Sequence, residues 1–193
     1  MKANKILVID VEATCWDGFP PKDEVQEIIE IGVIPVDIVN MQIGKGESIY
    51  VKPNNSIVST YCTELTGITL KKLQHEGIDY KDAVRVLTEK YDSRNCPMTS
   101  WGEFDKNMFW RGTDLYECDY PFHISHFNIK YAFSMWQRAT KLYGLKGALK
   151  RLNFEFKGTQ HCGHDDAYNT AVIFVEMLKS FDKIQNSVRR THV

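Results

Sequence analysis

The sequence predicts an α/β fold with a mixed five-stranded sheet, three antiparallel strands followed by two parallel ones, flanked by helices. Residues 5–10 (KILVID) form a continuous apolar run, which is typical of a strand buried on both faces. The β-branched segment 27–38 and the segment 46–53 predict the second and third strands. The short gap around Asn40 and Met41 predicts a hairpin between these two strands, so we expect the first three strands to be antiparallel. Beyond them, short strands alternate with helices, which completes an α/β pattern.

The chain changes character after the third strand. We expect residues 55–68 to form a loop that ends in Leu65-Thr66-Gly67-Ile68. A helix is expected over residues 80–91, because apolar residues recur there on one stripe. The residues of this stripe are Ala83, Val84, Leu87 and Tyr91.

The second half of the chain predicts the two remaining strands and four helices. Residues 96–102 (CPMTSWG) are expected to form the fourth strand, and a helix follows from about Glu103. Residues 123–127 (HISHF) are expected to form the fifth strand. The remaining helices are expected at about 129–142, 145–152 and 165–182.

The composition is that of an ordinary globular domain. Apolar residues make up 43% of the 193 residues and charged residues 25%. We therefore expect one domain over residues 1–183 and a short C-terminal tail over 184–193. No apolar stretch approaches the roughly 18 residues of a membrane span, so no contact with a membrane is expected. The first ten residues, MKANKILVID, contain no signal-peptide pattern, so we expect a cytoplasmic location.

The five cysteines are scattered and form no C-x-x-C pair, which favours free thiols over a disulfide framework. A group of cysteines and histidines in the second half could supply ligands for structural zinc, although its spacing matches no standard zinc finger. The ordinary interpretation is that these residues are unrelated. The group consists of Cys118, His123, His126, His161, Cys162 and His164.

The net charge of −1 excludes a protein that coats nucleic acid through bulk positive charge. The charge is unevenly distributed, because residues 130–157 carry seven basic residues and a single acid, Glu155. A solvated pair of amphipathic helices explains such a stretch. A basic flank beside an acidic site would also suit a phosphate backbone.

Two acids end the most apolar strand of the chain. Asp10 and Glu12 are two residues apart, so their side chains point to the same side of the strand, while Ile9 and Val11 face the other side. Placing two like charges together in a buried position is unfavourable unless a positive charge lies between them. The pair therefore predicts a site for a divalent cation, against the alternative of two solvated acids at a strand end.

Two further acidic positions accompany this pair. Asp105 follows the fourth strand, where Glu103 competes with it and where an acid also complements a helix dipole. Asp166 begins the last helix, and Asp165 beside it could serve as a cap. His161 precedes Asp166 by five residues, so an imidazole and a carboxylate could meet in one cleft.

Five motifs in this order resemble the DEDDh exonucleases, which have an RNase H-like fold. Within that family the resemblance is closer to the branch that contains the three-prime histone mRNA exonuclease and the bacterial KapD proteins. It extends from about Lys5 to Phe181. The motifs are Asp10-Val-Glu-Ala-Thr-Cys15, the run from Glu27 to Ile31, Leu65-Thr-Gly-Ile68, the mid-chain Asp105 and His161-Cys-Gly-x-Asp-Asp166.

This resemblance implies an enzyme and assigns roles to its residues. The metal ligands would be Asp10, Glu12, Asp105 and Asp166, which would hold two Mg²⁺ or Mn²⁺ ions, and His161 would be the general base. The reaction would be 3′→5′ hydrolysis of single-stranded RNA or DNA ends to nucleoside 5′-monophosphates. RNA and DNA both remain open as substrates.

The resemblance also suggests how the chain end is held. We expect Ala13, Thr14 and the loop Leu65-Thr66-Gly67-Ile68 to contact the terminal nucleotide. Trp101, like Trp16, is a candidate stacking platform, although core packing explains both tryptophans equally well. Two alternatives to the polymer exonuclease are an idle nucleic-acid- or protein-binding module of the same fold and a hydrolase of nucleotides or very short oligonucleotides.

Overall fold

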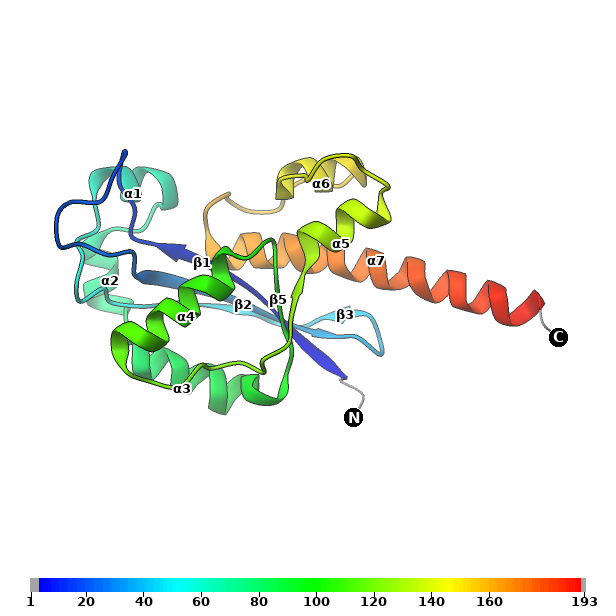
Figure 1. Ribbon diagram of the computed structural model, residues 1–193, viewed down its shortest axis with the longest axis horizontal. Helices are drawn as coiled ribbons and strands as arrows, with labels where there is room; N and C mark the ends of the chain where they lie inside the picture. Colours follow the sequence, from blue (N-terminus) through cyan, green and yellow to red (C-terminus); the bar gives the residue numbers. More distant parts are fainter. Residues whose placement is uncertain (1–3, 192–193) are drawn as a thin grey trace.

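The computed structural model describes residues 4–191, with side chains for residues 4–184, and its strands and helices form one mixed α/β unit (Figure 1). The strands are β1 (Lys5–Ala13), β2 (Ile28–Asp37), β3 (Gln42–Ile43), β4 (Glu47–Tyr50), β5 (Met98–Ser100) and β6 (His126–Asn128). The helices are α1 (Thr60–Thr66), α2 (Leu70–Glu76), α3 (Tyr80–Tyr91), α4 (Phe104–Tyr116), α5 (Ile129–Trp136), α6 (Leu145–Arg151) and α7 (Gly163–Thr191). None of the helices in this range has the length and apolar character needed to cross a lipid bilayer.

The sheet has the order β3-β2-β1-β5-β6, and β4 also pairs with β2. Strand β1 lies at its centre, antiparallel to β2 from Lys5↔Asp37 to Ala13↔Ile28 and parallel to β5. Strands β5 and β6 are parallel to each other. The mixed sheet with its antiparallel and parallel parts is therefore confirmed, and β3 is a two-residue addition to the five expected strands.

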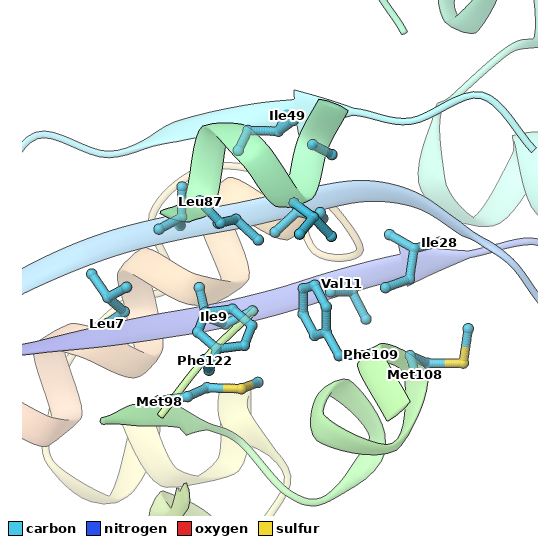
Figure 2. Close-up of a cluster of buried hydrophobic side chains, with 14 of the residues drawn as sticks. Leu7, Ile9, Val11, Ile28, Ile49, Leu87, Met98, Met108, Phe109 and Phe122 are labelled. Carbon is cyan, nitrogen blue, oxygen red and sulfur yellow. The ribbon is translucent and has the colours of Figure 1, made fainter. Parts of the chain in front are cut away.

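Both faces of β1 are covered, which explains its continuous apolar sequence. On one face Leu7, Ile9 and Val11 pack with residues of α3 and α4, including Leu87 and Phe109 (Figure 2). On the other face the side chains that alternate with these pack against α7. The residues in this second contact include Ile6, Val8, Ala167, Ala171 and Val175.

The expected loop at residues 55–68 is wrong, because α1 occupies most of its second half. Two polar caps stabilise this helix. The Ser59 hydroxyl accepts a hydrogen bond from the Cys62 N–H at 2.9 Å, and Gly67 ends the helix in the left-handed conformation with φ of 72°. The segment lacks a long apolar stripe, so periodicity alone did not indicate a helix of seven residues.

Two other boundaries differ from the prediction. The helix expected over 129–142 ends at Trp136, because Arg138 adopts a left-handed conformation with φ of 50°. The fifth strand begins at His126 instead of residue 123, because the Ser125 N–H bonds to the His123 ring in a tight turn.

The last helix is longer than expected. Helix α7 spans Gly163–Thr191, so residues 184–191 of the expected tail continue it. In Figure 1 its C-terminal half extends beyond the sheet. The division into a domain at 1–183 and a tail at 184–193 stays a prediction.

Candidate active site

Asp10 and Glu12 lie near the end of β1, on the strand face opposite Ile9 and Val11. Together with Asp166 they form a group of three carboxylates whose candidate ligand oxygens all lie within 4.8 Å of one another. Among the described residues this is the one such group of acidic, histidine or cysteine side chains. The structure thus brings together three of the four acids expected to bind metal.

A close contact between two glycines brings Asp166 to this position. Gly32 on β2 lies opposite Asp10 on β1. Gly163, the first residue of α7, packs directly against Gly32. A Cβ atom at Gly32 would lie only 2.0 Å from the carbonyl oxygen of Gly163, so no side chain fits there. The start of α7 therefore lies directly on the strands, and the first turn of this helix brings Asp166 over β1.

Glu30 is a buried acid whose role the sequence analysis did not assign. It pairs with Glu12 across β1 and β2 and is 1% exposed. Its carboxylate accepts hydrogen bonds from the Gly163 N–H at 3.0 Å and from the Ser48 hydroxyl at 2.5 Å. Glu30 therefore holds the first residue of α7, and a glutamate inside an apolar strand was the signal that could have identified it.

Asp105 occupies the first turn of α4 and is 4% exposed. Its Oδ1 atom accepts a hydrogen bond from the Val11 N–H at 2.9 Å, which ties the carboxylate to the strand between Asp10 and Glu12. The competing candidate, Glu103, points elsewhere and bonds to Lys106 and Asn128. Asp105 is thus the acid beside the cluster, although it lies outside the group of three.

The acids of this cluster have raised pKa values when no cation is present. Burial, followed by repulsion from Asp105 and Asp166, raises the pKa of Asp10 well above its usual value. Burial, followed by repulsion from Asp166, Glu30 and Asp105, raises the pKa of Glu12 to about 8. Burial also raises the pKa values of Asp105 and Asp166 to about 6, against hydrogen bonds that lower them.

This donor set fits a hard divalent cation. The cluster offers only carboxylate oxygens, which suit Mg²⁺ or Mn²⁺ and disfavour a soft metal. The raised pKa values fit the same kind of site, since two buried and two half-buried acids lie together without a compensating positive charge. A bound cation would remove this repulsion and restore the carboxylates to their charged form.

His161 lies on the loop before α7, and its side chain is exposed. Its backbone N–H donates to Asp166 Oδ2 at 2.7 Å, with the residue in a left-handed conformation at φ 61°. The backbone, rather than the imidazole, is therefore bonded to the cluster. The side chain stays exposed, and a positive charge on its ring would lower the pKa of Asp166.

The side chains expected to hold the chain end are buried in three cases and exposed in one. Thr14 is fully buried, and its hydroxyl accepts from the Glu27 N–H at 3.0 Å. Thr66 and Ile68 are also buried, with Ile68 packed against Leu73 and other residues of α1 and α2. Leu65 is 37% exposed. Of these four side chains, Leu65 alone is exposed enough to contact a substrate directly.

The first turn of α1 nevertheless lies against the end of β1. The Cys62 thiol is 3.5 Å from the Ala13 carbonyl oxygen, and Ala13 itself is buried. Gly67, with a positive φ, has open space where a Cβ would be, so the backbone there is accessible. These contacts keep Ala13 and Gly67 as candidates that act through the backbone.

Trp101 is half-buried and packs against a core cluster. Its indole N–H donates to the Tyr143 carbonyl at 3.2 Å, and its ring contacts Phe133 at a centroid distance of 5.7 Å. Phe104 is instead 48% exposed and directly precedes Asp105. An aromatic residue next to a candidate ligand was the sequence signal that could have identified Phe104.

The cysteine and histidine group expected as an alternative zinc site does not assemble within the described part of the chain. His126 bonds to Ser100 at 2.9 Å, whereas His164 contacts Asp165 at 3.1 Å on the first turn of α7. The five cysteines are free thiols, as expected.

The raised pKa values predict how stability changes with pH. Without metal, the folded protein holds more protons on Glu12 and its neighbours than the unfolded chain does between about pH 4 and 8. The free energy of unfolding should therefore fall as the pH rises through this window. Thermal unfolding in EDTA should give a lower Tm at pH 8 than at pH 5, and Mn²⁺ should raise Tm more at pH 8. A metal-free Tm that rises over this range would contradict the account.

Comparison with known proteins identifies relatives of this chain. A family model described as exonuclease matches residues 7–174. The human 3'-5' exoribonuclease 1 is 30% identical over 90% of this chain and 52% of its own length. The probable 3'-5' exonuclease KapD of Bacillus subtilis is 27% identical over 90% of this chain and 84% of its own.

The fold has close counterparts among solved structures. The nuclease domain of 3'hExo, a DEDDh family member bound to rAMP, aligns with a TM-score of 0.81 at 28% identity and covers 92% of both chains. The chain spans only 31% of the length of ERI1 exoribonuclease 2 from Xenopus laevis, to which it is 30% identical over 96% of its own length.

Proposed function

Because this chain belongs to the exonuclease family, we propose that it is a 3′→5′ exonuclease that removes nucleotides from single-stranded RNA or DNA ends. The observation that carries the proposal is the convergence of Asp10, Glu12 and Asp166 within 4.8 Å, with buried Asp105 beside them. RNA is the first substrate to test, because relatives of this chain are named exoribonucleases.

The four acids would hold two Mg²⁺ or Mn²⁺ ions. When bound, such ions lower the pKa of the attacking water and offset negative charge on the phosphate and on the leaving oxygen. Asp10 and Glu12 would contribute from the strand, Asp166 from α7 and Asp105 from α4. Because these acids lie on three different elements, their geometry depends on the packing of both helices against the sheet.

His161 would act as the general base. The side chain of His161 is exposed and its backbone N–H is bonded to Asp166, so the ring would reach a water molecule at the cluster. The imidazole would accept a proton from the attacking water, and the released product would be a nucleoside 5′-monophosphate. The left-handed backbone of His161 orients this residue toward the first turn of α7.

The terminal nucleotide would be held between the end of β1 and the end of α1. The backbone of Ala13 and Thr14 and the turn at Gly67 would contact its sugar, while exposed Leu65 and Phe104 would contact its base. Thr66 and Ile68 would stabilise this turn from inside, since the Thr66 hydroxyl accepts from the Ile68 N–H at 3.1 Å. Trp101 would support the site through packing.

The requirement for a free end can be tested with two forms of one RNA. The same sequence is offered in Mn²⁺ as a linear strand and as a covalently closed circle, and products are separated by chromatography. The proposal expects 5′-monophosphates from the linear strand and no cleavage of the circle. Cleavage of the circle would identify an endonuclease, and no cleavage of either would favour a binding module.

Replacing His161 with Gln should reduce kcat by roughly 10²–10⁴-fold, the usual contribution of a general base. The fold should be preserved, because the bond to Asp166 uses the backbone N–H at position 161. Single-turnover trimming rates with excess enzyme measure the effect. His75→Gln, an exposed histidine on α2, is the matched control and should trim normally. Normal trimming by His161→Gln would exclude the histidine as base.

A further inference from the structure

The segment from α5 to His161 carries positive charge that no carboxylate neutralises. Residues 129–161 contain a single acid, Glu155. Within the part of the chain whose side chains are described, none of the basic residues of this segment forms an ion pair, whereas five basic residues elsewhere do. The residues without an ion pair are Lys130, Arg138, Lys141, Lys146, Lys150, Arg151 and Lys157. Two of them donate hydrogen bonds to neutral side chains, Lys146 to Gln160 at 3.5 Å and Arg151 to Gln137 at 3.2 Å.

Two of these lysines line a cleft. Lys146 and Lys150 are one helical turn apart on α6, so their side chains lie on the same face. The cleft between them and residues 154–160 has a volume of about 640 Å³, which is within the range of ligand sites. Glu155 is its only acid, so two ammonium groups face one carboxylate.

The far wall of the cleft is the loop that leads to His161. Thr159 and Gln160 line the cleft, and His161 follows them directly. In Figure 1 this loop joins α6 to the start of α7, beside the end of β1. The cleft and the carboxylate cluster are therefore on adjoining parts of the molecule.

The first turns of α7 hold this loop in place. The Thr159 N–H donates to Asp165 Oδ2 at 2.8 Å, and Asn169 exchanges hydrogen bonds with both backbone groups of Lys157 at 3.0 and 2.8 Å. Gly158 has φ of 88°, and a Cβ there would lie 2.1 Å from Asp165. The wall is thus fixed by its own hydrogen bonds and does not need a ligand to form.

We propose that this cleft binds the nucleic-acid strand on the 5′ side of the scissile bond, with Lys146 and Lys150 contacting its phosphates. The inference rests on the proposed function, since a strand cut at its 3′ end can continue only in the 5′ direction. Phe154 lines the same cleft, is 37% exposed and would stack on a base. The cleft would thus favour substrates of several nucleotides over a dinucleotide.

The test compares Lys146→Gln/Lys150→Gln with the unmodified protein. Binding of fluorescent oligo-U of eight and two nucleotides is measured by anisotropy in EDTA, and trimming of both is measured in Mn²⁺. The double variant should bind the octamer roughly tenfold more weakly. The slope of log affinity against log salt concentration should become less steep by about 1.4, because two phosphate contacts to a single strand are lost. Binding and hydrolysis of the dinucleotide should change less than twofold.

Lys81→Gln/Arg85→Gln removes two cations at the same spacing from the exposed face of α3 and is the matched control. Unchanged octamer affinity and salt slope in the Lys146/Lys150 variant would overturn the inference, as would an equal loss in the control or for the dinucleotide. Binding is measured separately from trimming, so the two proposals can fail separately. If the octamer binds through these lysines but is not trimmed, the inference about the cleft stands and the exonuclease proposal is refuted.

Discussion

Replacing Asp10 with Asn is expected to abolish trimming and to stabilise the metal-free protein. The amide retains the size of the side chain but removes a carboxylate whose own pKa is raised well above its usual value by burial and by the charges of Asp105 and Asp166. A group whose pKa is raised in the folded state destabilises that state when it ionises, so we expect this substitution to raise the free energy of unfolding of the metal-free protein at pH 8. The trimming rate should fall at least about 10³-fold, because metal affinity and geometry are lost together.

Urea unfolding in EDTA at pH 8 measures the change in stability. Trimming of labelled RNA in Mn²⁺ measures the loss of activity. Asp114→Asn, an exposed acid of α4, is the control and should change neither. A destabilised Asp10→Asn protein without metal would show that the acid makes favourable contacts in the fold. In that case the charge repulsion inferred for this cluster would be wrong.

Replacing Gly32 with Ala should have the second-largest effect. The new Cβ would lie 2.0 to 2.4 Å from the backbone atoms of Gly163 and His164, so α7 would have to move away from the sheet. We expect a loss of about 3 kcal/mol in the free energy of unfolding, typical of a severe steric conflict in a core. Trimming should fall roughly 10²-fold, because a shift of about 1 Å at Asp166 misplaces a catalytic group.

Urea unfolding of the metal-free protein and single-turnover trimming measure these two losses. Gly147→Ala provides a matched control, since its Cβ would meet only the Tyr143 ring at 3.6 Å inside α6. This substitution should stabilise the protein by about 0.5–1 kcal/mol, because alanine favours a helix over glycine. Full stability of Gly32→Ala would show that α7 does not rest on β2 as described.

The order of the main strands and the convergence of the candidate ligands could be predicted because they depend on local patterns. The KILVID run predicted the central strand, and the two-residue spacing of Asp10 and Glu12 predicted that both point to one side. Such statements follow from strand geometry alone. The choice of Asp105 over Glu103 needed the family resemblance, since both stand at the same strand end.

Features that depend on contacts between distant segments were missed. Glu30 binds the N–H of Gly163, which is 133 positions away, and no local pattern indicates that pairing. Helix α1 was missed because its caps, Ser59 and Gly67, stabilise a helix too short to show periodicity. Ile68 was expected to contact the substrate, but its neighbours on α1 and α2 bury it.

The central claim is that the carboxylate cluster makes this chain a metal-dependent exonuclease. The most direct test is digestion of 5′-labelled single-stranded RNA and DNA in Mn²⁺ and in EDTA, sampled over time on a denaturing gel. The account predicts a ladder that shortens from the 3′ end in Mn²⁺ and intact strands in EDTA. Trimming that continues in EDTA, or no trimming by folded protein with metal present, would contradict it.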